Sequence, residues 1–340
     1  MPYHFNLPTI IELTVPQQAA LNDPGAISVS GGPGTGKSVV SLWRHIRNHE
    51  IGEKRSLLLT YTVTLAKYLS SAAAGINHDA GVNVRQTLWW IAHEQEDFDE
   101  IIIDEAQDVT QGKYDIIKSH ATEVTYGADD QQIIWPDEST TQAQLRTIFP
   151  DNEPYTLDEN FRNSLQIMRF VRSALPAKLI PEVTFEMLEA DNRTGNKPII
   201  MLTGGDNDKE NKAILDIVNQ FKSPTHNIGI LHPFVKRVTS IYEMLREAGI
   251  PCTKYVNEDT ELDHIEGVHV TTFKSCKGTE FDTIIVPDFQ RMRYYIRKND
   301  IVEENDYYVT FTRAKRNLFL ISDNDSTFID ASTYETEQIT

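Results

Sequence analysis

Short apolar runs alternate with longer amphipathic runs along most of the chain. The short runs are rich in Ile, Val and Leu and are bounded by polar residues or glycine, a pattern typical of buried strands in a parallel sheet. They cover residues 26–30, 57–61, 101–104, 123–126, 199–202, 228–231, 268–273, 283–286 and 318–321. Helix-like runs lie between them, as at 39–46, 164–175 and 234–248. The alternation predicts doubly wound α/β architecture, and this many strands favours two sheets.

The chain has 340 residues, which is long enough for two domains with separate cores. The segment Pro150-Asp151-Asn152-Glu153-Pro154 predicts a hinge between them, because its residues favour turns. We therefore expect an N-terminal domain over residues 1–150 and a C-terminal domain over 151–322. Residues 323–340 form a polar, acidic stretch that we expect to be a frayed tail.

The composition is that of an acidic globular protein, with a formal net charge of −18 and 40% hydrophobic residues. Solvated acidic segments are expected at 93–100 and 257–266. No apolar stretch has the length of a membrane span and residues 1–4 do not begin a signal peptide, so we expect a cytoplasmic protein without a membrane partner. Cys252 and Cys276 lie in unrelated contexts, which predicts neither a disulfide framework nor a metal cluster.

A complete phosphate-loop sequence follows the first apolar run. Residues 31–38 read Gly-Gly-Pro-Gly-Thr-Gly-Lys-Ser, and a helix-like run comes next. Glycines let consecutive backbone N–H groups face phosphates, Lys37 adds positive charge at the β and γ oxygens, and Ser38 offers a hydroxyl to Mg²⁺. The nucleotide-binding residues expected here are Gly32, Gly34, Thr35, Gly36, Lys37, Ser38 and Val39.

An acidic pair ends a second apolar run, Ile-Ile-Ile-Asp-Glu-Ala-Gln-Asp at 101–108. Asp104 is expected to hold Mg²⁺ through water. Glu105 is expected to orient and deprotonate the water that attacks ATP in an in-line displacement. A strand that ends in acidic residues is weak evidence by itself. Together with the phosphate loop, it predicts an ATP-hydrolysing site that uses Mg²⁺.

Further motifs follow in a defined order, and with them the chain resembles superfamily 1 helicases of the UvrD/Rep type from about residue 13 to 321. They are Leu-Thr-Val-Pro-Gln-Gln at 13–18, Gly-Ala-Asp-Asp-Gln-Gln at 127–132, Leu-Asp-Glu-Asn-Phe-Arg-Asn-Ser at 157–164, Thr-Thr-Phe-Lys-Ser-Cys-Lys-Gly-Thr-Glu-Phe-Asp at 271–282 and Tyr-Val-Thr-Phe-Thr-Arg-Ala-Lys at 308–315. The resemblance implies two RecA-like doubly wound parallel-sheet domains with the ATP site in the cleft between them.

The resemblance also implies contacts with the base and ribose of ATP. Gln17 would read the adenine edge, with Gln18 as the alternative register. Phe161 would stack on the adenine. Glu280 would reach toward the ribose.

At the γ-phosphate, the resemblance implies three catalytic residues besides Lys37 and Glu105. Gln131 would sense the γ-phosphate and couple the ATP site to the nucleic-acid site. Arg162 and Arg313, both from the second lobe, would neutralise the developing phosphoryl charge. Ala128 departs from the family, which commonly has aspartate there.

Candidate nucleic-acid contacts come from the same motifs, namely Thr60, Thr62, Thr87, Trp135, Thr272 and Lys274. Threonine hydroxyls suit phosphate oxygens, although Thr62 could equally cap a helix. Residues 87–90 are expected to contact the nucleic-acid strand. Trp135 is expected either to stack on a base or to pack in the interior. Lys274 replaces the family's usual histidine and keeps a donor for phosphate.

Two large insertions that accompany duplex unwinding in the family have no room between 70 and 100 or between 232 and 267. The leading prediction is thus an ATP-dependent single-stranded DNA translocase or minimal helicase. The alternative is an ATPase switch subunit in DNA processing or anti-phage defence, with a partner such as a nuclease. A plain P-loop ATPase or kinase would require the later motifs to be coincidental. The sequence does not decide whether the nucleic acid is DNA or RNA, or in which direction the protein would move along it.

Overall fold

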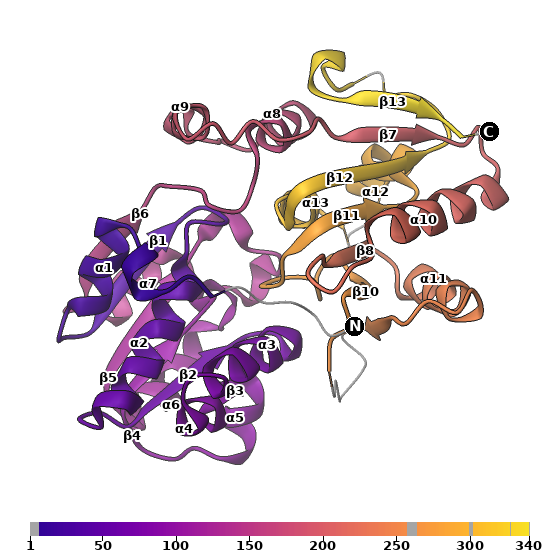
Figure 1. Ribbon diagram of the computed structural model, residues 1–340. Coiled ribbons are helices and arrows are strands. Elements are labelled where there is room, and N and C mark those ends of the chain that lie inside the picture. The colour runs from indigo at the N-terminus through magenta and orange to yellow at the C-terminus, as the bar shows by residue number, and fades with distance from the viewer. Residues whose placement is uncertain (1–6, 257–263, 299–301, 327, 340) are drawn as a thin grey trace. The chain divides into compact units, whose positions relative to one another are not determined.

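The computed structural model describes residues 7–256, 264–298, 302–326 and 328–339 (Figure 1). The chain divides into two compact units, with the division between Phe161 and Arg162. The expectation about residues 1–4 and most of that about the acidic segment 257–266 lie outside the described residues. Every helix in the described part is too short or too polar to cross a bilayer.

The N-terminal unit contains, among its described residues, a parallel sheet in the order β3-β2-β4-β5-β1-β6. Its strands are β1 (Ile27–Gly31), β2 (Ser56–Thr60), β3 (Val84–Gln86), β4 (Phe98–Ile103), β5 (Ala121–Ala128) and β6 (Glu153–Leu157). Its helices are α1 (Val15–Asn22), α2 (Lys37–Ile51), α3 (Val63–Ala74), α4 (His78–Val82), α5 (Thr87–His93), α6 (Tyr114–Ser119) and α7 (Gln142–Ile148). Strand β5 lies between β4 and β1, so the loops after these three strands meet at one edge of the sheet.

The C-terminal unit contains a second parallel sheet in the order β13-β7-β12-β11-β8-β10-β9 across its described residues. Its strands are β7 (Ile199–Leu202), β8 (Ile228–His232), β9 (Thr253–Tyr255), β10 (Val268–Thr272), β11 (Phe281–Val286), β12 (Ala314–Ser322) and β13 (Glu335–Gln338). Its helices are α8 (Leu165–Ala174), α9 (Glu182–Ala190), α10 (Asn207–Phe221), α11 (Val235–Glu247), α12 (Met292–Lys298) and α13 (Glu304–Phe311). The prediction of two parallel α/β sheets is confirmed.

Apolar side chains of strands and helices fill the cores of both units. In the N-terminal sheet, Ile101 and Ile103 on β4 pack in one cluster with Trp90 of α5 and Tyr114 of α6. In the C-terminal sheet, Ile228 and Ile230 on β8 pack with apolar residues of α10 and α11. The β-branched runs therefore form buried central strands, as a parallel sheet covered by helices requires.

Two boundaries differ from the sequence prediction. The expected hinge at 150–154 is wrong, because β6 pairs in parallel with β1 in register Ile27↔Glu153 to Gly31↔Leu157 and so extends the first sheet. The expected frayed tail contains β13, which pairs with β7 at the edge of the second sheet (Figure 1). Residues 87–90, the expected contact with a nucleic-acid strand, begin helix α5, which the Gln86 side chain caps by accepting from the Trp89 N–H.

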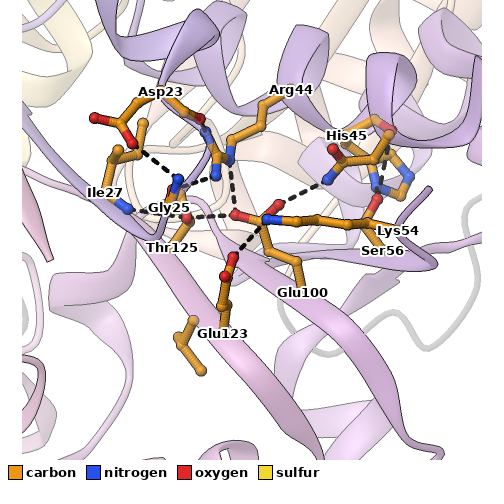
Figure 2. Close-up of polar contacts among 12 residues, drawn as sticks. Asp23, Gly25, Ile27, Arg44, His45, Lys54, Ser56, Glu100, Glu123 and Thr125 are labelled. Carbon is orange, nitrogen blue, oxygen red and sulfur yellow. Dashed lines mark hydrogen bonds and ion pairs between the residues drawn. The ribbon is translucent and has the colours of Figure 1, made fainter. Parts of the chain in front are cut away.

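A buried ion pair ties elements together at the amino end of β4 (Figure 2). The Arg44 Nε donates to Glu100 Oε1 at 2.7 Å, and the same guanidinium donates to the backbone carbonyls of Asp23 and Gly25. The Thr125 hydroxyl donates to Glu100 Oε1 at 2.6 Å, and Asn48 Nδ2 donates to Glu100 Oε2 at 2.7 Å. Glu100, with no exposed surface, therefore has hydrogen bonds on both oxygens.

Candidate nucleotide site

The loop between β1 and α2 adopts a conformation that requires its glycines. Gly34 and Gly36 have φ values of +73° and +90°, in the left-handed region that favours glycine. A Cβ at Gly36 would lie 2.4 Å from Gln17 Nε2. The loop leads into the first turn of α2, whose N–H groups lack intrahelical partners and favour an anion. The loop therefore has the backbone geometry that a phosphate-binding loop requires.

Lys37 lies at the mouth of this loop with only 7% of its surface exposed. Its Nζ donates to the carbonyl oxygens of Gly31 at 2.7 Å and Gly32 at 3.0 Å. The same nitrogen is 3.9 Å from Asp129 Oδ2. Protein oxygens thus surround the ammonium group, and a bound phosphate would have to replace some of them.

Gln17, rather than Gln18, lies against the loop. Its Nε2 donates to the Thr35 carbonyl at 2.9 Å, and its Oε1 accepts from the Thr14 N–H at 2.9 Å. Gln18 instead donates to the Leu13 carbonyl at 2.8 Å, away from the loop. This placement favours the Gln17 register, although in this conformation the amide supports the loop itself.

Asp104, directly after β4, is a buried carboxylate with 1% exposure. Neither oxygen has a geometric hydrogen-bond partner among the residues that the structure describes. Burial raises the pKa of Asp104 to about 7, and the neighbouring Glu105 charge adds to the rise, whereas the nearby Ser38 hydroxyl and Lys37 ammonium lower it. A buried carboxylate beside a hydroxyl fits Mg²⁺, which prefers a few protein oxygens and completes its shell with phosphate and water.

Glu105 has a backbone conformation that is rare for its residue type, with φ +57°. Its side chain is 6% exposed, and its Oε2 accepts from Gln107 Nε2 at 2.5 Å. Gln107 Oε1 in turn accepts from the Asp129 N–H at 3.1 Å. A rare conformation that the surroundings hold in place is typical of functional sites.

Asp129 lies after β5 and organises the motif that contains Gln131. Its Oδ1 accepts from the Gln131 N–H at 3.0 Å, and its Oδ2 accepts from Gln132 Nε2 at 2.6 Å. Sequence reasoning quoted both Gln107 and Asp129 within motifs but assigned neither a role. Both stand among other polar residues, Asp-Glu-Ala-Gln-Asp at 104–108 and Asp-Asp-Gln-Gln at 129–132, so the sequence carries no signal that separates them from their neighbours.

Phe161, the last residue of the N-terminal unit, is connected to the loop by its backbone. Its N–H donates to the Gly34 carbonyl at 2.8 Å, while the residue is 43% exposed. An exposed aromatic ring held beside a phosphate loop can take a base on its face. Val39, by contrast, is a partly buried residue in the first turn of α2.

In the C-terminal unit, Glu280 joins two cations at the amino end of β11. Arg162 Nε donates to its Oε2 at 3.1 Å and Lys315 Nζ donates to its Oε1 at 3.0 Å. Burial would raise the pKa of Glu280, but the charges of Arg162 and Lys315 outweigh it and lower that pKa to about 2. Sequence reasoning missed Lys315, which comes to Glu280 because β11 and β12 pair side by side.

Arg313 is 1% exposed and lies inside the C-terminal unit. Its Nε donates to the Val309 carbonyl at 3.1 Å, and its Nη1 donates to the Thr279 carbonyl at 3.3 Å. Asn163 Nδ2 donates to the carbonyls of Thr312 and Ala314, so the segment next to Arg162 is attached to the segment around Arg313. In this conformation the Arg313 guanidinium is engaged by main-chain oxygens.

The candidate nucleic-acid contacts differ in accessibility. Thr60 and Thr87 are fully buried, with the Thr87 hydroxyl donating to the Thr60 carbonyl at 3.0 Å. The Thr62 hydroxyl accepts from the Leu65 N–H and caps α3, which was the alternative interpretation from the sequence.

Three further candidates lie near the ends of β5 and β10. The Thr272 hydroxyl donates to Ser275 Oγ at 2.8 Å. Trp135 is partly buried, with its ring centroid 5.0 Å from that of Tyr61. Lys274 is also partly buried. Trp135, Lys274 and Thr62 are therefore partly exposed and could contact a nucleic-acid strand, whereas Thr60, Thr87 and Thr272 are buried.

The phosphate loop and the buried Asp-Glu pair have the arrangement expected of a P-loop nucleotide site. Residues 138–325, more than half of the chain, match the AAA domain family AAA_12, and the chain belongs to this family. Residues 24–192 match the Schlafen group 3 DNA/RNA helicase domain. At this level the matches support a helicase core of the superfamily 1 type.

Among individual proteins, the chain is 28% identical over 245 residues to the "Putative ATP-dependent DNA helicase" of Acanthamoeba polyphaga mimivirus. That alignment covers 65% of this chain and 34% of the viral protein, so the chain spans about a third of its relative.

Two solved structures also align with the chain. The C-terminal domain of a possible DNA helicase from Lactobacillus plantarum has 18% identity and a TM-score of 0.38, over 52% of this chain and 98% of that one. The PRRSV helicase has 14% identity and a TM-score of 0.45, over 93% of this chain and 56% of that one.

Proposed function

We propose that the chain is an ATP-dependent single-stranded DNA translocase or minimal helicase of the UvrD type. The observation that carries the proposal is the buried Asp104 carboxylate beside Ser38, with Glu105 adjacent, at the carboxyl end of β4. A carboxylate that can bind Mg²⁺ next to a phosphate loop is an arrangement that phosphoryl transfer requires. The helicase descriptions of the matched families support a nucleic acid as the activating ligand.

The chemistry follows from the placement of the side chains. Lys37 exchanges carbonyl oxygens of the loop for phosphate oxygens of ATP. Ser38 and Asp104 hold Mg²⁺, which when bound neutralises charge on the phosphates. Glu105 accepts a proton from the attacking water.

Other residues complete the proposed mechanism. Phe161 stacks on the adenine, and Gln131 detects the γ-phosphate. Arg162 and Arg313 supply positive charge to the transition state. We assign the strand contacts mainly to Trp135 and Lys274, which combine an aromatic surface with a cation.

A second candidate function is an ATPase switch within a larger assembly, such as one containing a nuclease. The observation that favours it is Arg313, whose guanidinium is occupied by the Val309 and Thr279 carbonyls and is 1% exposed. If Arg313 is to reach ATP, these bonds must break, and a partner protein could provide the driving force. The net charge of −18 also disfavours tight nucleic-acid binding without additional basic surface.

The test is the steady-state ATPase rate of the full chain at low salt, with single-stranded DNA, single-stranded RNA, duplex DNA or no polymer. A stimulation of at least tenfold by single-stranded DNA is expected, and Glu105→Gln should abolish it while retaining ATP binding. A rate that no polymer changes would favour the switch. Undiminished turnover in Glu105→Gln would contradict the assigned base.

A further inference from the structure

Gln107 is a buried glutamine whose side chain joins the loop after β4 to the loop after β5. We propose that Gln107 is a positioning residue for hydrolysis, which holds the Glu105 carboxylate in its catalytic orientation and fixes it relative to Asp129. This inference rests on the proposed function, because it assumes that Glu105 is the general base.

The contacts of Gln107 use both the nitrogen and the oxygen of its amide group. Its Nε2 donates to Glu105 Oε2 at 2.5 Å, and its Oε1 accepts from the Asp129 N–H at 3.1 Å. The backbone carbonyl of Gln107 accepts from the Thr140 N–H at 2.9 Å. The main chain is therefore anchored independently of the side chain, which leaves the amide to orient Glu105.

The other end of this connection reaches the groups that contact phosphate. Asp129 lies 3.9 Å from the Lys37 ammonium and accepts the Gln131 N–H at 3.0 Å. Both Gln107 and Asp129 are at most 5% exposed, so water does not compete strongly for these bonds. Gln107 thus connects Glu105, which accepts a proton from the attacking water, to the residues that sense the γ-phosphate.

Glu105 needs such support because its backbone, with φ +57°, lies in a region that few non-glycine residues occupy. A general base must also lie within hydrogen-bond reach of its water, and a misplacement of about 1 Å can cost about 100-fold in rate. Loss of the Gln107 amide should consequently lower the rate of hydrolysis more than it lowers affinity for ATP.

A purely structural role makes a different prediction. A buried amide that merely stabilises the loops would, when removed, lower the melting temperature and weaken ATP binding, and it would do so whether or not Glu105 is present. Coupling between the two side chains separates these interpretations, because residues that act as a unit give non-additive losses in rate.

The experiment uses the full chain with Gln107→Met, Glu105→Gln and the double variant. Gln142→Met is the matched control, since Gln142 Nε2 donates only a long bond of 3.5 Å to the Ala128 carbonyl in the same unit. Single-turnover hydrolysis gives the rate constant, and a fluorescent ATP analogue gives the Kd. Thermal melting checks folding.

We expect Gln107→Met to lower the rate constant by about 10- to 100-fold with Kd changed less than about threefold. In the Glu105→Gln background, the same substitution should change the residual single-turnover rate by less than about twofold. An unchanged rate, a loss confined to Kd, or an equal loss in both backgrounds would overturn the inference. Should Gln107→Met fail to fold, Gln107→Leu, which also removes the amide without adding a charge, replaces it with the same expectations.

The outcomes also distinguish this inference from the function on which it rests. If Glu105→Gln turns over normally, the assigned base is wrong. If Glu105→Gln is inactive and Gln107→Met is fully active, the base stands and the positioning role of Gln107 is wrong.

Discussion

Strand β4 carries a buried acid at each end, and the two acids have opposite environments. Glu100 at the amino end has both oxygens hydrogen-bonded, by Arg44, Thr125 and Asn48 (Figure 2). Asp104 at the carboxyl end has no hydrogen bond of good geometry on either oxygen within the described residues, and the nearby Ser38 hydroxyl and Lys37 ammonium favour its charge. Burying an unpaired carboxylate is costly, so a fold retains one where a ligand will pair it. The comparison separates a structural end of the sheet from a functional end.

The largest expected effect is at the functional end. Asp104→Asn should lower ATP hydrolysis by at least about 1000-fold, because the amide is a poor Mg²⁺ ligand. The same change should not destabilise the free protein. The folded-state pKa of about 7 exceeds the ordinary 3.8, so the Asp104 carboxyl favours folding when protonated, and this contribution is lost as the pH rises through 7.

At pH 8 without Mg²⁺, Asp104→Asn should therefore gain on the order of 2 kcal/mol in unfolding free energy. Urea unfolding at pH 5 and pH 8 provides the measurement, with the larger gain expected at pH 8, because the loss begins near the ordinary pKa of 3.8 and is complete only above the folded-state pKa of about 7. A loss of stability at pH 8 would show that Asp104 is a structural acid like Glu100.

The next effect is at the structural end. Arg44→Met should lower the unfolding free energy by about 3 to 5 kcal/mol, since it leaves Glu100 buried without its cation. Urea unfolding at pH 7 measures this loss, and Arg47→Met is the control, because Arg47 lies one turn away from the buried pair and bonds to Asn22. If the unfolding free energy falls by less than about 1 kcal/mol, the hydrogen bonds from Thr125 and Asn48 are enough to stabilise the buried Glu100 carboxylate.

A smaller effect depends on pH and involves His45, which lies near this network in Figure 2. Its ring bonds to Ser56 Oγ and to the Ala80 carbonyl, both at 2.9 Å. Burial lowers the pKa of His45 from 6.5 to about 3, so its contribution is present above pH 6.5 and is lost as the pH falls.

When the pH is lowered from 7.5 to 5, His45 should reduce the unfolding free energy of the wild-type protein by about 2 kcal/mol. His45→Gln should lack that part of the acid sensitivity in urea unfolding. Equal pH dependence in the two proteins would place the acid sensitivity elsewhere.

The smallest expected effect contrasts two glycines of the phosphate loop. Gly36→Ala should cost about 1 to 3 kcal/mol, because its φ is +90° and the new Cβ would lie 2.4 Å from Gln17 Nε2. Gly32→Ala should leave thermal stability unchanged, since its Cβ would meet nothing within 4 Å. Equal melting temperatures for the two variants would show that the loop rearranges around Gly36.

Much of the fold and of the phosphate-binding edge could be predicted because their signals are local. The apolar runs gave the central strands, and residues 31–38 and 104–105 lie where the motifs placed them. The boundary at 150–154 was wrong because Pro154 lies on β6, an edge strand where a missing N–H is tolerated. Strand β13 was missed because its residues are polar and exposed, which hides the pattern of a strand.

The supporting residues of the site could not be predicted for a different reason. Gln107 meets Asp129, and Lys315 meets Glu280, only after the sheets have assembled. Arg313 likewise has its guanidinium on main-chain oxygens, a contact that the motif does not encode. Motifs specify chemical groups, whereas tertiary structure decides which of them are engaged.

The central claim is that the carboxyl end of β4 is built to receive Mg²⁺ with a nucleotide. The direct test is calorimetric titration of ADP into the wild-type chain, Asp104→Asn and Arg44→Met, each with Mg²⁺ and with EDTA, at a temperature where all three are folded. The account predicts that Mg²⁺ tightens ADP binding at least about tenfold in the wild type and Arg44→Met and has no effect in Asp104→Asn. Equal Mg²⁺ dependence in Asp104→Asn would contradict it.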